Sequence, residues 1–374
     1  MRKQKIILRA FSNAAFLVVL VLCNSLVLFS GTAKAQSSLK ISQDVTYNFE
    51  SLFNDANENT PQAPVISSIA VKETDIFAGA DDRRVYRFDS ETGIPVSVFQ
   101  SADSWVRSIA FSPVANEIAV LSQNGQLTIW DPDTQTKMRE AREKTKGAHA
   151  FAYSPNGKVI AVAGFEPYVE IYDASTLEKL QSWPTPSMSS TAIQFSHFGD
   201  LLAVGGRNGV VRVWNTQTGT VAREFVLSEE GSDNGRRVRA IAFSADDSLI
   251  AIGGEHSQIL VYNAKTGALT SKLILPSLKD DVSDSTRAIP VGKGKVYSLT
   301  FYGAGNLLVS GDSLNRVILW DAASGINTIN LSEGYGHTGT VSTLLYVGKD
   351  EHPDGPFILS SGFDTTIIRW KIEE

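Results

Sequence analysis

The feature that most constrains the fold of this chain is a pattern that recurs seven times. In each copy an alternating strand ends in an aromatic residue, and in six copies Asp or Asn follows directly. The aromatic residues stand 42 to 58 residues apart, at Phe88, Trp130, Tyr172, Trp214, Tyr262, Trp320 and Trp370. Repeats of about this length are typical of four-stranded propeller blades. The pattern therefore predicts an all-β chain with seven blades.

Two further strand-like segments precede each aromatic residue. The first type alternates large and small residues and runs into a turn, as in 108–113 (SIAFSP). The second type is an apolar run, as in 201–206 (LLAVGG), which suits a strand that is buried on both faces. No stretch after residue 35 shows a sustained helical period. Each blade is therefore expected to contain four antiparallel strands.

These residues resemble the WD-repeat family. The dipeptides Trp130-Asp131 and Trp320-Asp321, the FSP-type turns and the AVGG-type strands match its pattern. The resemblance covers nearly all of residues 63–374 and implies a seven-bladed β-propeller around a narrow channel. It also implies a buried network of Asp, His, Ser and Trp side chains. That network is expected to be complete only in the last blade, where its members are His337, Ser360, Asp364 and Trp370.

The end of the chain predicts how the ring closes. Only four residues follow Trp370, too few for the outer strand of the seventh blade. An unpaired edge would invite aggregation. Residues 45–49 (VTYNF) alternate in polarity and are expected to supply the missing strand, with residues 36–44 disordered before it. The chain thus divides into residues 1–35, an N-terminal segment at 36–62 and the propeller at 63–374.

Residues 1–35 have the pattern of a signal peptide. A basic start is followed by an almost wholly apolar run at 14–29, and Thr32-Ala33-Lys34-Ala35 offers a small-x-small cleavage site. Cleavage would leave Gln36 first, with no membrane span, and would direct the protein to the periplasm or outside the cell. An uncleaved anchor is the alternative, although the apolar run is short for a membrane span.

Charge and cysteine content limit the possible functions. The chain has 34 Lys and Arg against 40 Asp and Glu, and a formal net charge of −6. Without residues 1–35, 29 basic residues remain against 40 acidic ones, a net charge of −11. Nucleic-acid-binding proteins usually have the opposite sign, so no nucleic-acid partner is expected. The single cysteine, Cys23, lies in the signal segment, so a disulfide or a cysteine nucleophile is not expected either.

Three motifs look chemical, but each has a simpler interpretation as a turn. Residues 334–339 (GYGHTG) have dinucleotide-binding glycine spacing, yet a strand follows where a helix is needed. Residues 311–314 (GDSL) match an esterase nucleophile block, but no Asp-x-x-His partner occurs. Residues 350–355 (DEHPDG) contain oxygen ligands without EF-hand spacing. We expect no catalytic residue, cofactor or metal.

Alternating strands place two sets of loops on one side of the ring, which we call the top face: those from the second to the third strand of a blade, and those between blades. Alignment of the blades puts one residue of each first strand at this rim: Ser67, Arg107, His149, Thr191, Arg239, Tyr297 and Ser342. Arg and aromatic residues are over-represented among interface hot spots. The predicted partner-binding residues are Trp105, Arg107, His149, Arg207, Arg237, Arg239, Lys295 and Tyr297.

The pattern therefore favours a non-enzymatic scaffold or recognition module of the cell envelope. We expect it to be a monomer on its own and to bind a protein or peptide at the top face. Two alternatives remain. One is a propeller enzyme, such as a lactonase-like hydrolase or a quinone-dependent dehydrogenase, and the other is a carbohydrate or surface adhesion module. Fold alone does not choose between them.

Overall fold

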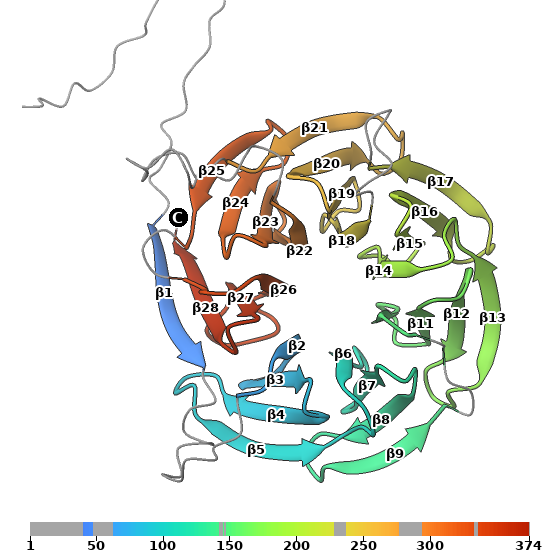
Figure 1. The fold of residues 1–374 in the computed structure, drawn as a ribbon, viewed down its shortest axis with the longest axis vertical. Coiled ribbons are helices and arrows are strands. Elements are labelled where there is room, and N and C mark those ends of the chain that lie inside the picture. The colour runs from blue at the N-terminus through green and yellow to red at the C-terminus, as the bar shows by residue number, and fades with distance from the viewer. Residues whose placement is uncertain are drawn as a thin grey trace, which may run out of the picture. The chain divides into compact units, whose positions relative to one another are not determined.

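The computed structural model describes residues 40–47, 63–141, 145, 147–227, 237–276, 294–332 and 336–373, and all regular structure within them is β-strand. The strands form seven four-stranded sheets, which are the blades of a seven-bladed β-propeller within residues 41–372 (Figure 1). The predicted fold class is thus confirmed.

Blades 1 to 3 follow one another along the chain. Blade 1 contains β2 (Ile66–Lys72), β3 (Asp75–Ala80), β4 (Arg84–Asp89) and β5 (Pro95–Gln100). Blade 2 contains β6 (Val106–Phe111), β7 (Ile118–Ser122), β8 (Leu127–Asp131) and β9 (Thr136–Glu140). Blade 3 contains β10 (Ala150–Tyr153), β11 (Val159–Ala163), β12 (Tyr168–Asp173) and β13 (Lys179–Pro184).

Blades 4 to 7 complete the ring. Blade 4 contains β14 (Ser190–Phe195), β15 (Leu201–Gly206), β16 (Val210–Asn215) and β17 (Val221–Val226). Blade 5 contains β18 (Val238–Phe243), β19 (Leu249–Gly254), β20 (Gln258–Asn263) and β21 (Leu269–Ile274). Blade 6 contains β22 (Val296–Tyr302), β23 (Leu307–Asp312), β24 (Val317–Asp321) and β25 (Ile326–Asn330). Blade 7 contains β26 (Val341–Val347), β27 (Phe357–Gly362), β28 (Ile367–Glu373) and, out of sequence order, β1 (Lys40–Tyr47).

The core lies between neighbouring blades. The second strands β7, β19 and β27 are buried along their whole length, as their apolar sequences predict. The repeat aromatics Phe88, Tyr172, Trp214, Trp320 and Trp370 are also buried. Trp130 and Tyr262 are only partly buried. One apolar cluster joins Val261 of blade 5 to Trp320 of blade 6, and equivalent clusters join other neighbouring pairs. Each blade is therefore stabilised by the next.

The N-terminal strand completes the last blade, because β1 is the outer strand beside β28 (Figure 1). The predicted bounds were wrong, since the strand covers 40–47 instead of 45–49, and residues 40–44, expected to be disordered, belong to it. Asn48 and Phe49 lie outside the described residues. The sequence hides the start because Ser42, Gln43 and Asp44 are exposed and show no apolar alternation.

Contacts of β1 explain why it starts early and how it fastens the ring. The Asp44 carboxylate lies 2.6 Å from Arg369 and 3.1 Å from Lys371, both on β28. The Tyr47 side chain is fully buried, and its hydroxyl donates to the Ser90 carbonyl of blade 1 at 2.6 Å. The Ser90 hydroxyl in turn contacts His352 Nε2 of blade 7 at 2.7 Å. Ser90 of blade 1 thus hydrogen-bonds to two residues of blade 7, Tyr47 on β1 and His352, and these bonds connect the first and last blades.

The predicted signal segment, residues 1–35, lies outside the described residues. Within the part of the chain that the structure does describe, no helix has the length and hydropathy needed to cross a membrane.

Candidate functional site

The first strands of the blades stand around the centre of the ring (Figure 1). Near the start of each strand, one side chain borders a shared cavity of about 250 Å³. All seven aligned rim positions line it: Ser67, Arg107, His149, Thr191, Arg239, Tyr297 and Ser342. We call these seven residues the channel mouth. Side chains as far apart in the sequence as Ser67 and Ser342 are thus brought together by the repeat.

Three residues of the channel mouth are small, and their hydroxyls join neighbouring blades. Ser67 donates to the Val106 carbonyl of blade 2 at 2.6 Å. Thr191 of blade 4 donates to the Val238 carbonyl of blade 5. Ser342 of blade 7 lies 3.4 Å from the Ile66 carbonyl of blade 1. These three hydroxyls hydrogen-bond to the neighbouring blades. The other four residues that line the cavity have large side chains.

Two of the large residues belong to a cation, ring and carboxylate group in blades 5 and 6. The guanidinium of Arg239 lies 4.3 Å from the ring centroid of Tyr297, a favourable cation–π distance. Its Nε donates to Glu255 at 2.8 Å, and Lys295 Nζ lies 2.7 Å from the other oxygen of that carboxylate. Burial opposes ionisation of Glu255, but Lys295 and Arg239 outweigh it and lower the pKa of this carboxyl.

The other two large residues lie in blades 2 and 3. Arg107 lies 5.9 Å from the ring centroid of Trp105, and Trp105 itself is 51% exposed. The Nε of Arg107 is buried and has no hydrogen-bond partner among the described residues. The His149 ring packs edge-on against Phe165 with centroids 4.6 Å apart. Exposed aromatic rings therefore stand beside both cavity-facing residues.

Positive charge dominates the electrostatics around His149. Burial, and after it the charges of Arg107, Arg237 and Arg207, together lower the pKa of His149 to about 4. The pKa of Arg237 is lowered by burial and then by Arg239 and Arg207. Burial alone lowers the pKa of Arg107. His149 is thus neutral at pH 7, while the arginines remain charged.

The predicted partner-binding residues fall into two groups, those that line the cavity and those that lie around it. Arg107, His149, Arg239 and Tyr297 line the cavity itself. Trp105, Arg207 and Arg237 do not line it, but they contact or electrostatically influence residues that do. Lys295 does not line it either, and it binds Glu255, the carboxylate that pairs with Arg239. Glu255 was missed by the sequence analysis. The strand register does not reveal this pair, because Val238 pairs with Gly254 and the Glu255 amide donates to the Arg237 carbonyl, so that Arg237 is the residue opposite Glu255. A register shift follows between Val238 and Ala240, at Arg239, and no sequence signal marks it.

The polar network of the last blade has the following geometry. Both oxygens of Asp364 lie 3.0 Å from His337 Nδ1, and His337 Nε2 lies 2.7 Å from the Ser360 hydroxyl. Trp370 Nε1 donates to the same hydroxyl at 2.8 Å. Among its described residues, blade 6 keeps the last of these links, from Trp320 to Ser310, and Leu314 occupies the Asp position.

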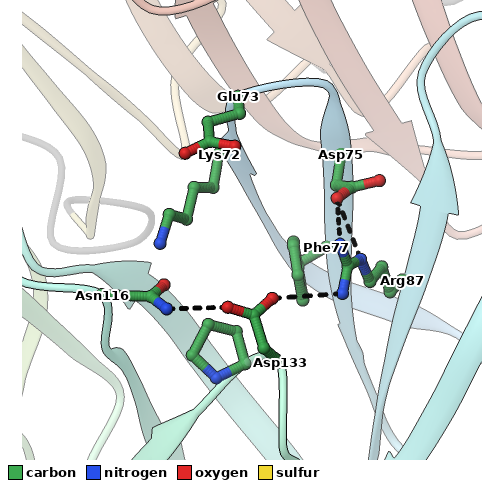
Figure 2. A pocket seen from close by; sticks show the side chains of 8 residues that line it. Lys72, Glu73, Asp75, Phe77, Arg87, Asn116 and Asp133 are labelled. Carbon is green, nitrogen blue, oxygen red and sulfur yellow. Dashed lines mark hydrogen bonds and ion pairs between the residues drawn. The ribbon is translucent and has the colours of Figure 1, made fainter.

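A second cavity of about 220 Å³ lies on the opposite face between blades 1 and 2 (Figure 2). Arg87 is bound there by Asp75 and Asp133, and Asn116 donates to Asp133 at 2.8 Å. Lys72 borders the same cavity, 5.7 Å from the Phe111 ring centroid. The charges are largely paired between the two blades, which is typical of a structural seam.

The chemical-looking motifs lie in turns and connections, apart from Gly311 and Asp312, which end strand β23. Residues 336–339 lead into strand β26, and residues 333–335 lie outside the described residues. In the 311–314 segment the Asp312 carboxylate is bound by Arg316 Nε at 2.7 Å, and the chain continues into β24. Residues 350–355 form a turn. Among the described residues, no three His, Cys, Asp or Glu side chains are grouped so as to hold a metal ion.

Comparison with known proteins identifies the repeat. Four segments match the family described as WD domain, G-beta repeat, at residues 93–131, 178–215, 286–321 and 329–371. A search of curated proteins finds no match to the sequence. The matched segments extend across blade boundaries in the propeller described above. The chain is thus a seven-bladed β-propeller that carries WD40 repeats in four places and matches a WD-repeat propeller family.

Proposed function

We propose that this protein is a non-enzymatic scaffold of the cell envelope that binds a protein or peptide partner at its top face. WD40 propellers are commonly protein-interaction scaffolds. The observation that carries the proposal is the channel mouth, where Arg107, His149, Arg239 and Tyr297 gather around one cavity. Large, rigid aromatic and Arg side chains of this kind are the usual anchors of protein interfaces.

The compartment is part of the same proposal. The basic start, the apolar run and the small-x-small site of residues 1–35 support export with cleavage before Gln36. The intact mass of the exported protein should then correspond to a chain that starts at Gln36. A mass that still includes residues 1–35 would contradict this part of the proposal.

Removal of exposed aromatic side chains tests the binding face. Trp105 is 51% exposed on the top face, and Phe198 is 68% exposed on the opposite face, in the turn between β14 and β15. Wild type, Trp105→Ala and Phe198→Ala would each be used to capture partners from envelope extract. The affinity of the captured protein would then be measured for all three. Truncation of a hot spot weakens binding by about thirtyfold, a loss of about 2 kcal/mol.

The proposal requires that Trp105→Ala weakens binding to about this degree, while Phe198→Ala leaves affinity within about threefold. Thermal unfolding of both variants would check that the fold is kept. The opposite ranking would place the binding surface on the other face. Turnover of a lactone or reduction of a dye by the purified protein would contradict the non-enzymatic assignment.

A further inference from the structure

Arg107 differs from the other strongly basic side chain of the channel mouth. Arg239 is neutralised by Glu255, which also binds Lys295. Arg107 has no ion pair or hydrogen bond among the described residues, although its Nε is shielded from water. A buried donor without a partner costs free energy, and the cost is larger for a charged group. The fold thus retains a cationic group whose hydrogen-bonding capacity is unused.

Arg107 is also held in place for a ligand. The Trp105 ring lies beside its guanidinium, at a centroid distance of 5.9 Å, which restricts the planar group. A guanidinium presents its donors in a fixed fork that matches a carboxylate. Less conformational freedom is lost when a restricted side chain binds, so the contact contributes more to affinity.

Blades 5 and 6 show that cations at this rim bind a carboxylate. Glu255 brings a carboxylate between Arg239 and Lys295 at the same rim. On the blade 2 side of the channel mouth, no carboxylate among the described residues pairs with Arg107. A ligand carboxylate bound to Arg107 would form the same kind of ion pair that Glu255 forms with Arg239 in blade 5.

We infer that the channel mouth binds a peptide carboxylate, with Arg107 as the residue that receives it and His149, which lines the same cavity, as a further hydrogen-bonding group. This inference rests on the proposed function and adds the chemistry of the partner, an acidic peptide segment. The cavity, about 250 Å³, has room for one side chain or chain end. The net charge of −6 disfavours non-specific attraction of an acidic peptide, so binding requires a local site.

Three fluorescent peptides of equal length test the inference by anisotropy. The first is rich in Glu and has an amidated C-terminus, the second has Gln in place of Glu and is amidated, and the third has Gln and a free C-terminus. Binding of the first or third, with at least about tenfold weaker binding of the second, is expected, because hydrogen bonds to charged groups are the strong ones. The peptide that binds identifies the source of the carboxylate as a side chain or a chain end.

Charge-removing variants locate the site. Arg107→Gln should weaken binding of the acidic peptide by about tenfold or more. Lys265→Gln, on the exposed turn between β20 and β21 of the opposite face, should change it by less than about twofold. Arg107→Lys keeps the charge but loses the fork and should give an intermediate affinity.

Equal binding of the three peptides, no binding of any of them, or an unchanged affinity in Arg107→Gln would overturn the inference. The proposed function would remain separately testable. If Trp105→Ala still weakens capture of the natural partner while no acidic peptide binds, the top face is an interface of a different chemistry.

Discussion

At the scale of single residues, equivalent positions of the repeat carry either structural or binding side chains. Ser67, Thr191 and Ser342 use short hydroxyls to join blades, whereas Arg107 and Arg239 point large cations at the same cavity. The repeat fixes where a side chain lies, and its chemistry decides what it can do. A long side chain at such a position gives up an inter-blade hydrogen bond worth about 1 kcal/mol.

The last blade provides a residue-scale stability prediction. Burial opposes ionisation of Asp364, but the hydrogen bond from His337 outweighs it, and the pKa is lowered to about 2. Asp364→Ala leaves His337 and the Thr338 amide without their acceptor. It should therefore lower the free energy of unfolding by about 1–3 kcal/mol in urea denaturation. Asp350→Ala, at an exposed site of the same blade, should change it by less than about 0.5 kcal/mol.

Low pH should weaken the contribution of Asp364 to the free energy of unfolding. A carboxyl whose folded pKa is depressed stabilises the fold above its unfolded value, near pH 4, and the stabilisation is lost as the pH falls toward about 2. The stability difference between wild type and Asp364→Ala should thus shrink in that window. Equal stabilities at pH 7 would contradict the hydrogen-bond network.

The pKa of His149 is a second residue-scale prediction. Burial and the nearby arginines hold it at about 4, so the ring should stay neutral throughout a titration from pH 8 to pH 5. Arg107→Gln removes one of the repelling charges and should raise the pKa toward its ordinary value of about 6.5. NMR titration of the imidazole, assigned with His149→Gln, measures both. An ordinary pKa in wild type would mean that the ring is exposed and the cations are distant.

At the scale of strands, repetition made most elements predictable from the sequence, while unrepeated elements were harder to place. The apolar runs and the terminal aromatics located the seven blades because burial between blades imposes them. The outer strand β1 has exposed Ser42, Gln43 and Asp44, so polarity alone could not reveal its start. Its early residues are held by the ion pair of Asp44 with Arg369, a contact over 300 residues apart in the sequence.

The closing strand gives the element-scale prediction. A chain that starts at Asn48 lacks β1, and with it the buried Tyr47 side chain and the Asp44 ion pairs. Loss of a large buried aromatic side chain alone costs about 3–5 kcal/mol. We expect a loss of stability of at least this size, together with aggregation at the exposed edge of β28. A chain that starts at Lys40 is the control and should unfold like one that starts at Gln36.

Urea denaturation and light scattering compare the three chains. Equal unfolding midpoints for the chains that start at Lys40 and Asn48 would mean that β1 does not fasten the ring. A loss in the Lys40 chain as well would assign a stabilising role to residues 36–39.

At the scale of the whole molecule, the ring brings equivalent residues of the seven repeats together around one cavity. Alignment of the blades predicted which residues of the first strands meet, since equivalent positions fall at equal heights around the channel. Alignment could not predict pairing within the rim. That Glu255 neutralises Arg239 while Arg107 has no such partner among the described residues depends on turn residues that differ from blade to blade. The partner chemistry follows from those differences.

Hydrogen–deuterium exchange of the protein with and without its captured partner tests the central claim most directly. Binding at the top face should slow exchange in the backbone around the channel mouth, at residues 105–108, 147–150, 237–240 and 295–298. Exchange in the turns of the opposite face, such as 215–219 and 263–267, should be unchanged. Protection of those turns, with unaltered exchange around the channel mouth, would contradict the account.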